Sequence, residues 1–312
     1  MAAALGPIAG PRATVRVEGD RASIILDVTG LGPAAGEALE AEVRAAALAV
    51  PGIVTVRIAQ TTERAPAERT QRRIVAVASG KGGVGKSTVA ANLALGLKAL
   101  GHEVGLVDAD IYGPSQPKLM GVEGTRPQAT DKLLDPVPTP HGIGLLSMGQ
   151  LVPADQAIAW RGPMAANALT QLIVANWADA DTLVVDMPPG TGDVQLTMVQ
   201  KHKPAGAVIV STPQDLSLID AKRAIDLFRK AGVPIIGLIE NMSGYACPHC
   251  GEMSDPFGRG GAEAAAGDLG IPFLGRILLD IAIRTASDAG NGSQAAAFGE
   301  VAARVDAWLT GD

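Results

Sequence analysis

Eight consecutive residues, Gly80 to Ser87, have the types and the order of a phosphate-binding loop. They match the pattern G-x-x-x-x-G-K-[ST], whose glycines let backbone N–H groups turn toward bound oxygen atoms. Lys86 of this pattern reaches the terminal phosphates, and the hydroxyl of Ser87 is placed to ligate Mg²⁺. The sequence therefore predicts a nucleoside triphosphate site. Its predicted binding residues are Gly80, Lys81, Gly82, Gly83, Val84, Gly85, Lys86, Ser87 and Thr88.

The segments on either side of this loop have the pattern that such a site requires. Residues 74–78 are apolar and typical of a buried parallel strand. After the loop, Val89, Leu93 and Leu97 recur at helical spacing, and Gly101 ends the predicted helix. A loop at the start of a helix receives the positive end of the helix dipole, which favours bound phosphate.

Aspartates follow two other apolar segments of the chain. Asp108 and Asp110 come after residues 104–107, and Asp186 ends the run 182–186. Because ligands collect at the carboxyl ends of parallel strands, we expect all three side chains near the phosphate loop. One carboxylate of the first pair can hold the water shell of Mg²⁺ and the other can orient the attacking water, although Asp110 has a capping role as its alternative. Asp186 fits the Walker B pattern, which holds Mg²⁺ through water, so the predicted magnesium residues are Ser87, Asp108 and Asp186.

The two cysteines of the chain form the sequence Cys247-Pro248-His249-Cys250. Such a pair can be a redox pair, half of a metal site, or incidental; its place after a late strand does not fit a thioredoxin-like motif. Two thiolates are too few for a Cys₄ zinc or iron–sulfur site, but two copies of the chain supply four. Lys81 also points to a second copy, because a lysine after the first glycine cannot easily fold back onto its own phosphates. A solvated loop lysine is the alternative.

The composition excludes several classes of partner. The 312 residues carry a formal net charge of −6 without a basic block, so a nucleic-acid partner is not suggested. The first residues lack the positive charge and long apolar core of a signal peptide, and no apolar run reaches the ~18 residues of a membrane-spanning helix. Residues 302–312 do not form a basic amphipathic anchor. We therefore expect a soluble, cytoplasmic protein without a membrane partner.

The pattern of apolar segments predicts a small α+β domain, a linker and a larger α/β domain. Residues 1–61 form the small domain, with predicted strands 15–17, 23–28 and 54–58 and a helix 37–49. Residues 62–73 are polar and indicate a linker. Residues 74–312 alternate short apolar strands with helices, which predicts a doubly wound, mostly parallel sheet. Its predicted strands are 74–78, 104–107, 144–147, 182–186, 207–211, 235–240 and 273–275.

The phosphate loop and the cysteine segment resemble a known group of ATPases. Lys81 gives the loop the form K-G-G-V-G-K-[ST], the signature-lysine Walker A loop of nitrogenase iron protein, the arsenite-pump ATPases and the Min and Par positioning ATPases. Residues 239–251 closely resemble the E-N-M-S-x-x-x-C-P-x-C-G signature of the Mrp/ApbC-type iron–sulfur cluster carriers. Residues 108–115, 160–164 and 187–193 resemble the same branch, and the similarity spans nearly all of residues 73–285.

This resemblance implies a homodimeric ATPase with nucleotide held between the two subunits. It implies that Lys81 crosses to the phosphates of the partner, that Asp110 positions the attacking water, and that Asp108 lies near the metal. It also places Asn241 at the adenine edge. The catalytic set implied is Lys81, Lys86 and Asp110.

The resemblance further implies a labile 4Fe–4S cluster held between the subunits by Cys247 and Cys250, with ATP and Mg²⁺ as cofactors. The cluster would come from a scaffold or donor and pass to apo iron–sulfur proteins. Bridging zinc and a spare thiol pair are alternatives for the cysteines. A Min- or Par-like positioning ATPase and an electron-transfer ATPase are alternatives for the chain. The small domain of such carriers usually has a cysteine in a T-P-G-C-P turn, but this chain has Thr29-Gly30-Leu31-Gly32-Pro33, so we expect a structural or docking role there.

Overall fold

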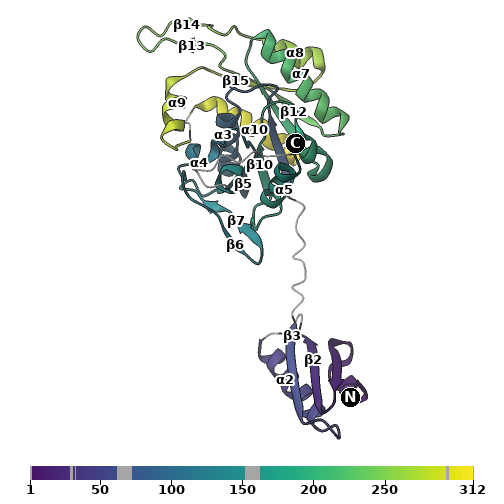
Figure 1. The fold of residues 1–312 in the computed structure, drawn as a ribbon. Coiled ribbons are helices and arrows are strands. Elements are labelled where there is room, and N and C mark those ends of the chain that lie inside the picture. Colours follow the sequence, from purple (N-terminus) through teal and green to yellow (C-terminus); the bar gives the residue numbers. More distant parts are fainter. Residues whose placement is uncertain are drawn as a thin grey trace. The chain divides into compact units, whose positions relative to one another are not determined.

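The computed structural model of the chain divides into two compact units, Met1–Thr70 and Gln71–Asp312 (Figure 1). It describes residues 2–28, 31, 33–61, 72–151, 162–292 and 295–311. Most of the predicted linker, the turn residues Thr29, Gly30 and Gly32, and the motif residues Trp160 and Arg161 lie outside this part of the chain. None of the helices that are described is both long and apolar enough to cross a membrane.

The first unit is a three-stranded sheet with two helices that share its core. Strands β1 and β2 form an antiparallel hairpin, and β3 runs parallel to β2. Along β2, Ala22, Ile24 and Leu26 are buried and alternate with more exposed residues; they form one core with Leu5 and Val43 from the helices. The elements are α1 (Ala2–Ala9), the 3₁₀ segment η1 (Gly10–Arg12), β1 (Ala13–Glu18), β2 (Arg21–Asp27), α2 (Pro33–Leu48) and β3 (Thr55–Thr61).

The second unit is built on a sheet with the strand order β15-β12-β11-β4-β10-β5-β9-β8. Seven of these strands are parallel, and β8 pairs antiparallel with β9 at one edge. The seven parallel strands are those predicted from the apolar runs; β8 has two residues and no such pattern. The strands are β4 (Arg73–Ala78), β5 (Val104–Asp108), β8 (Val137–Pro138), β9 (Gly144–Ser147), β10 (Thr182–Asp186), β11 (Gly206–Ser211), β12 (Ile235–Asn241) and β15 (Phe273–Ile277).

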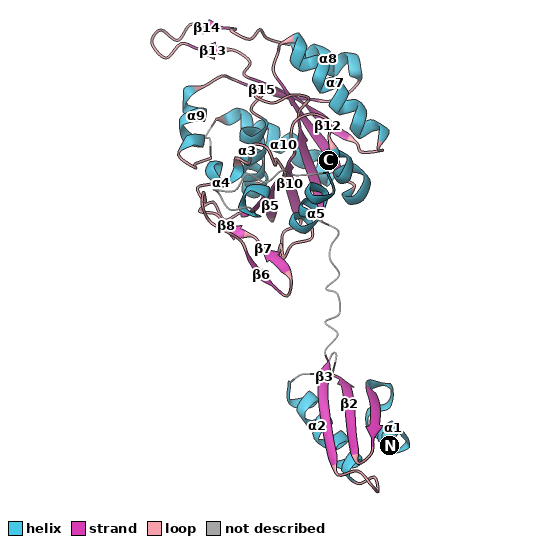
Figure 2. Ribbon diagram, viewed as in Figure 1, coloured by secondary structure: helices cyan, strands magenta, loops and turns pink. Residues whose placement is uncertain are grey.

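Helices cover both faces of this sheet (Figure 2). In β4, Ala76 and Ala78 join the core beneath α5, α7 and α8, whereas Val75 and Val77 join the core beneath α3 and α10. Burial on both faces explains why the strands are continuous apolar runs, and the doubly wound fold is confirmed. The long helices are α3 (Lys86–Ala99), α5 (Gly162–Ile173), α7 (Asp215–Lys230), α8 (Gly261–Leu269) and α10 (Ala296–Thr310). The shorter ones are α4 (Gln116–Leu119), η2 (Met148–Leu151), α6 (Asp193–Thr197), the π-helix η3 (Met198–His202) and α9 (Ile281–Asp288).

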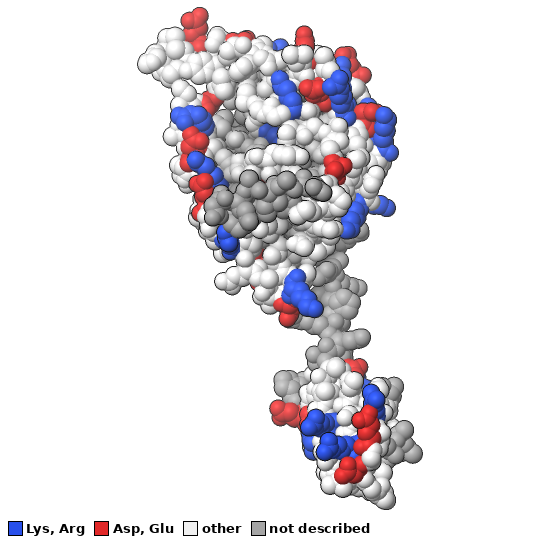
Figure 3. All heavy atoms as spheres, in the orientation of Figure 1, with Lys and Arg blue, Asp and Glu red and all other residues white. Residues whose placement is uncertain are grey.

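Two small hairpins lie outside the main sheet and have no counterpart among the predicted elements. One consists of β6 (Gln128–Thr130) and β7 (Leu133–Asp135), and the other of β13 (Tyr245–Ala246) and β14 (Met253–Ser254). Each has only two or three residues per strand, too few for a recognisable alternation. On the face shown in Figure 3, basic and acidic side chains are interspersed rather than gathered into one basic patch.

Candidate functional site

The sheet order brings the phosphate loop and the predicted carboxylates to one edge. Strand β10 pairs with β4 on one side and with β5 on the other, so Asp186 stands opposite both Val77 and Asp108. The loop leaves the carboxyl end of β4 and enters α3, as predicted. Together with Asp110 and Pro189, the loop lines a pocket of about 270 Å³.

The glycines of the loop are required by its geometry. Gly83 and Gly85 have φ angles of 81° and 79°, in the left-handed region that favours glycine, and Gly85 is the N-cap of α3. A Cβ atom on Gly80 would lie 2.0 Å from the backbone carbonyl carbon of Asp220. A side chain at Gly80 would therefore displace the loop from α7.

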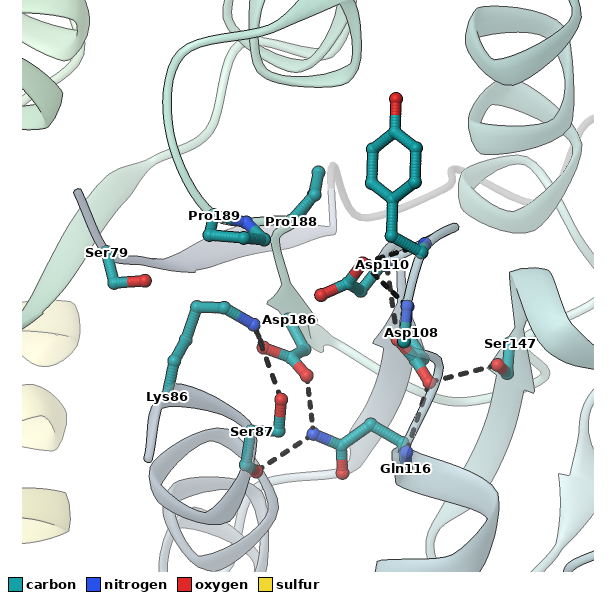
Figure 4. Close-up of polar contacts among 12 residues, drawn as sticks. Ser79, Lys86, Ser87, Asp108, Asp110, Gln116, Ser147, Asp186, Pro188 and Pro189 are labelled. Carbon is teal, nitrogen blue, oxygen red and sulfur yellow. Dashed lines mark hydrogen bonds and ion pairs between the residues drawn. The ribbon is translucent and has the colours of Figure 1, made fainter. Parts of the chain in front are cut away.

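Lys86 and Asp186 form a buried ion pair inside this site (Figure 4). The two side chains are 6% and 0% exposed. The lysine Nζ also lies 3.4 Å from the hydroxyl of Ser87. The structure thus gathers three of the predicted residues around one point, and the Lys86 charge that would meet a phosphate is neutralised by Asp186.

Asp108 lies behind this group and is held by three donors. Its carboxylate accepts hydrogen bonds from the backbone N–H of Gln116 at 3.1 Å, the hydroxyl of Ser147 at 3.0 Å and the backbone N–H of Asp110 at 3.2 Å. Burial and the nearby charge of Asp186 raise the pKa of Asp108 to about 7. The structure therefore places Asp108 beside Asp186 but gives it no direct contact with Ser87.

Asp110 has the bonds of a cap and also faces the pocket. Its Oδ1 accepts from the backbone N–H groups of Tyr112 at 3.0 Å and Gly113 at 3.2 Å. The other carboxylate oxygen points away from that turn (Figure 4). Since Asp110 lines the pocket beside the loop, both of the roles considered for it are compatible with its position.

Lys81 is half-buried on the rim of the same pocket. Its backbone carbonyl accepts a hydrogen bond of 2.9 Å from the hydroxyl of Ser79, which fixes the start of the loop. Among the described residues, its ammonium group has no acidic partner within salt-bridge distance. Within the described part of the chain, the side chain is thus a cation without an acidic partner at the mouth of the phosphate site.

Gln116 belongs to this site although its role was not predicted. It is fully buried, and its Nε2 donates to the backbone carbonyl of Ser87 and to Oδ2 of Asp186, both at 2.9 Å. It therefore links the loop, Asp186 and Asp108. A glutamine between Ser115 and Pro117 carries no sequence signal of such contacts, because they depend on how β5 and β10 pair.

Asn241 ends β12 against the back of the phosphate loop. Its Nδ2 donates to the backbone carbonyl of Val84 at 2.8 Å and occupies the space that a Cβ on Gly85 would fill. The side chain is 7% exposed and does not line the pocket in front of the loop. Its contact with an adenine ring stays a prediction.

Cys247 and Cys250 lie in the turn between β13 and β14. The turn is closed by hydrogen bonds from the N–H of Cys247 to the carbonyl of Glu252 and from the N–H of Gly251 to the carbonyl of Cys247. Backbone N–H groups of Cys250 and His249 and the thiol of Cys250 lower the pKa of the Cys247 thiol. Both cysteines are free, and Cys250 is exposed.

One chain supplies only these two thiols to a metal. Across the described residues, no group of three or more His, Cys, Asp or Glu side chains is arranged to hold a metal ion. The turn therefore offers a pair of sulfur ligands, with N–H groups that stabilise a thiolate, at an exposed point.

Solved structures of other proteins support the architecture. A nucleotide-binding protein from Archaeoglobus fulgidus in complex with ADP, and with cobalt, is 39% identical, covers 71% of this chain and 88% of its own, and has a TM-score of 0.63. The cell division ATPase MinD of Pyrococcus furiosus is 25% identical with a TM-score of 0.56, over 76% of this chain and 99% of its own.

Curated relatives and a family model agree on one family. The iron-sulfur cluster carrier protein of Methanocaldococcus jannaschii is 49% identical over 219 residues, 69% of this chain and 76% of the relative. That of Deinococcus radiodurans is 47% identical over 258 residues, 81% and 73% of the two chains. The ParA family model described as the NUBPL iron-transfer P-loop NTPase matches residues 70–306. The chain therefore belongs to the family of iron-transfer P-loop NTPases.

Proposed function

We propose that this chain is an ATP-dependent carrier of 4Fe–4S clusters that works as a homodimer. The observation that carries the proposal is the exposed turn in which Cys247 and Cys250 stand together without a third ligand from the part of the chain that the structure describes. Two such turns, one from each subunit, provide the four thiolates of a 4Fe–4S cluster. The names of the relatives, iron-sulfur cluster carrier proteins, support the same cargo.

The chemistry of the turn suits a cluster that must be released. N–H groups directed at Cys247 stabilise its thiolate form, which is the form that binds iron. A cluster held at an exposed seam, by two bonds from each subunit, is accessible to the thiols of an apo iron–sulfur protein. A donor or scaffold loads the site, and an apo acceptor empties it. Free thiols in this role require a reducing compartment, so the proposed location is the cytoplasm.

Apolar side chains around the turn support a partner surface for the second subunit. Met253, Leu278 and Ile281 are exposed large hydrophobic residues. A groove of about 210 Å³ lies beside the cysteines, lined by residues 245–248 and 278–281. Exposed apolar surface of this kind commonly marks a protein interface. A second copy of the chain would cover it and bring the two cysteine pairs together.

The phosphate site supplies the ATPase half of the function. Lys86 holds the terminal phosphates once it leaves Asp186, Asp110 orients the attacking water, and Lys81 reaches the nucleotide of the partner subunit. The hydroxyl of Ser87 and the carboxylate of Asp186, both near the Lys86 ammonium, form an oxygen-rich donor set that suits Mg²⁺. Ser87 would bind the ion, and Asp186 and Asp108 would hold its waters. When bound, Mg²⁺ neutralises phosphate charge.

A short segment connects the phosphate loop to the cysteines. Asn241 bonds to Val84 in the loop, and only residues 242–244 separate it from β13. Met242 has a φ angle of 58°, and Ser243 is fixed by a bond from its N–H to the carbonyl of Ile277. A non-glycine residue in this conformation is held by its surroundings. A shift of the loop on ATP binding would therefore be passed to the cysteine turn.

Anaerobic reconstitution with iron and sulfide tests the proposal. We expect about four irons per dimer, with broad thiolate-to-iron absorption. Cys247→Ser and Cys250→Ser should each abolish the cluster and leave ATP binding intact, because the phosphate loop lies in another part of the fold. His249→Ala, in the same turn but with both thiols present, is the matched control and should keep the cluster. If the protein bound one zinc per dimer tightly and did not bind iron, the cysteines would form a structural zinc site in an ATPase, and the carrier function would be overturned.

A further inference from the structure

The segment that carries the cysteines leaves the main sheet and returns to it. It begins after Ser243, which follows β12, forms the hairpin β13–β14, and ends at Gly260, the N-cap of α8. Most residues between 246 and 259 are exposed, and Figure 1 shows the hairpin standing away from the main sheet. Residues 244–259, here called the cysteine segment, therefore depend on their two ends for a fixed position.

Both ends of the cysteine segment are bonded to one buried oxygen atom. Oε1 of Glu240, a completely buried residue, accepts hydrogen bonds from the hydroxyl of Ser243 at 2.7 Å and from the backbone N–H of Gly260 at 2.9 Å. Oε2 accepts from the backbone N–H of Ala262 at 2.8 Å, in the first turn of α8. The carboxylate of Glu240 thus joins the start of the segment to its end.

This carboxylate is charged although it is buried. Burial by itself would raise the pKa of Glu240. The hydrogen bonds described above and the charge of Arg276, whose Nε lies 3.2 Å from Oε1, outweigh burial and hold the pKa below its ordinary value. The N–H groups at the start of α8 also favour a negative charge there. Because hydrogen bonds to a charged acceptor are stronger than neutral ones, the two ends are held by strong bonds.

The strand that supplies Glu240 also contacts the phosphate loop. Successive side chains of a strand point to opposite faces of the sheet. Glu240 faces α8, whereas Asn241 faces the loop, where its amide donates to the carbonyl of Val84. Glu240 therefore ties the cysteine segment to the same end of β12 that contacts the nucleotide site.

We propose that Glu240 is a positioning residue for the cysteine pair: its carboxylate holds the two ends of the cysteine segment together and so fixes where Cys247 and Cys250 stand. This inference rests on the proposed cluster site and adds to it a residue that is not itself a ligand of the cluster. Four thiols from two subunits must meet around one cluster. A segment that is already held at its base loses less conformational entropy when they do.

Proteolysis of the iron-free, full-length protein tests this junction directly. Arg259 is exposed, and trypsin cleaves after it at the peptide bond whose N–H, that of Gly260, is bonded to Glu240. Glu240→Gln keeps the size of the side chain, but its NH₂ group would face a backbone N–H, so one bond is lost. We expect cleavage after Arg259 to become about tenfold faster, which corresponds to the loss of one hydrogen bond to a charged group.

Two further measurements separate a local change from general unfolding. Cleavage after the exposed Lys132, in the turn between β6 and β7, is the internal reference and should not change. Glu240→Asp keeps the charge beside Arg276 but is too short to reach both ends of the segment. It is the second variant in case the glutamine does not fold, and it should show the same faster cleavage after Arg259.

The reconstituted cluster gives the second readout. Glu240→Gln should release iron to a chelator about tenfold faster than wild type and alter the electron paramagnetic resonance spectrum of the reduced cluster. Glu263→Gln is the matched control, because Glu263 pairs with the same Arg276 but from a more exposed position within α8. It should match wild type in cleavage after Arg259, in iron release and in the spectrum.

The inference is overturned if the Glu240 variants are cleaved after Arg259 at the wild-type rate. It is also overturned if cleavage is faster but iron release and the spectrum match wild type, since Glu240 would then only stabilise the fold. A wild-type protein that takes up no iron would overturn the proposed function. The cleavage rates would in that case still decide whether Glu240 joins the two ends of the segment.

Discussion

The nucleotide end and the cysteine turn of the second unit differ in how much of each site a single chain supplies. At the nucleotide end, Lys86, Asp186 and Gln116 are buried and bonded to one another. At the cysteine turn, two short strands flank a pair of free thiols, of which Cys250 is exposed and Cys247 is half-buried. At the phosphate site only the Lys86 ion pair has to change before phosphate binds, whereas the cysteine turn offers two of the four sulfur ligands that the proposed cluster requires.

This difference assigns different roles to the two regions. The buried end is suited to detect the nucleotide, and the exposed turn is suited to load and lose a cargo. Lys81 belongs to both descriptions, because it lines the nucleotide pocket and we propose that its ammonium reaches the site of a second subunit. The first prediction therefore tests whether the nucleotide site of one chain also needs Lys81 from a second subunit.

We expect Lys81→Ala to lose ATP hydrolysis while it keeps nucleotide binding, because in the proposed dimer Lys81 acts on the site of the partner subunit. Asp110→Ala should also be inactive, since it lacks the group that orients water. Mixing the two variants should restore activity: in a mixed dimer, the site with Asp110 receives Lys81 from the other subunit. Random pairing at equal amounts leaves about a quarter of all sites intact. The measurement is ATP turnover of the mixture.

If Lys81 acted within its own subunit, every site of the mixed dimer would lack one of the two groups. The mixture would then stay as inactive as its components. Wild-type protein diluted with Lys81→Ala provides the control for subunit exchange.

A second prediction concerns the cost of burying two carboxylates at the nucleotide end. Burial and Asp186 raise the pKa of Asp108 from 3.8 to about 7, so between these values the folded protein binds more protons than the unfolded chain. The contribution of Asp108 to stability therefore falls as the pH rises through this window and is constant above it. Asp108→Asn stays neutral at every pH. Its free energy of unfolding relative to that of wild type should therefore rise by on the order of 1 kcal/mol or more from about pH 5 to about pH 8.

Urea unfolding of both proteins across this pH range measures the difference. Asp268→Asn, at an exposed position of α8, is the control and should follow wild type at every pH. If the free energies of unfolding of wild type and Asp108→Asn changed with pH in parallel, the buried carboxylate would not be the cause of the pH dependence.

The sequence predicted the parts of this molecule that repeat a strong pattern. The seven parallel strands are apolar runs because both of their faces are buried, and the phosphate loop has a fixed spacing of glycines and lysine. These features depend on neighbouring residues, so they can be recognised in the sequence.

Contacts that depend on strand pairing could not be predicted in this way. Ser147 bonds to Asp108 from 39 positions away, and Gln116 bonds to Asp186 from 70 positions away. Both contacts follow from the pairing of β5 with β9 and β10. The position of Asn241 behind the loop, with its amide on Val84, has the same origin, since it depends on β12 pairing with β11, which in turn pairs with β4.

The smallest predicted effect tests the connection between the two regions. Asn241→Ala removes the bond to Val84, which is worth about 1 kcal/mol, so ATP binding should weaken about fivefold. ATP should also change the rate of cluster transfer to an apo acceptor less than it does in wild type, because the loop no longer contacts the end of β12. If Asn241 also contacts the adenine ring, the preference for ATP over GTP should fall in the same variant.

The matched control is Asn176→Ala, which removes an exposed asparagine that bonds to Asp135 far from both sites. It should leave nucleotide affinity and cluster transfer unchanged. The two readouts of Asn241→Ala separate two roles of one side chain: a lost ATP preference with normal coupling assigns Asn241 to the base, and weakened coupling with an intact preference assigns it to the loop. The bond to Val84 joins the phosphate loop directly to the strand that leads into the cysteine turn. If Asn241→Ala matched wild type in both ATP preference and cluster transfer, the effect of ATP binding would be transmitted to the cysteine turn through other contacts.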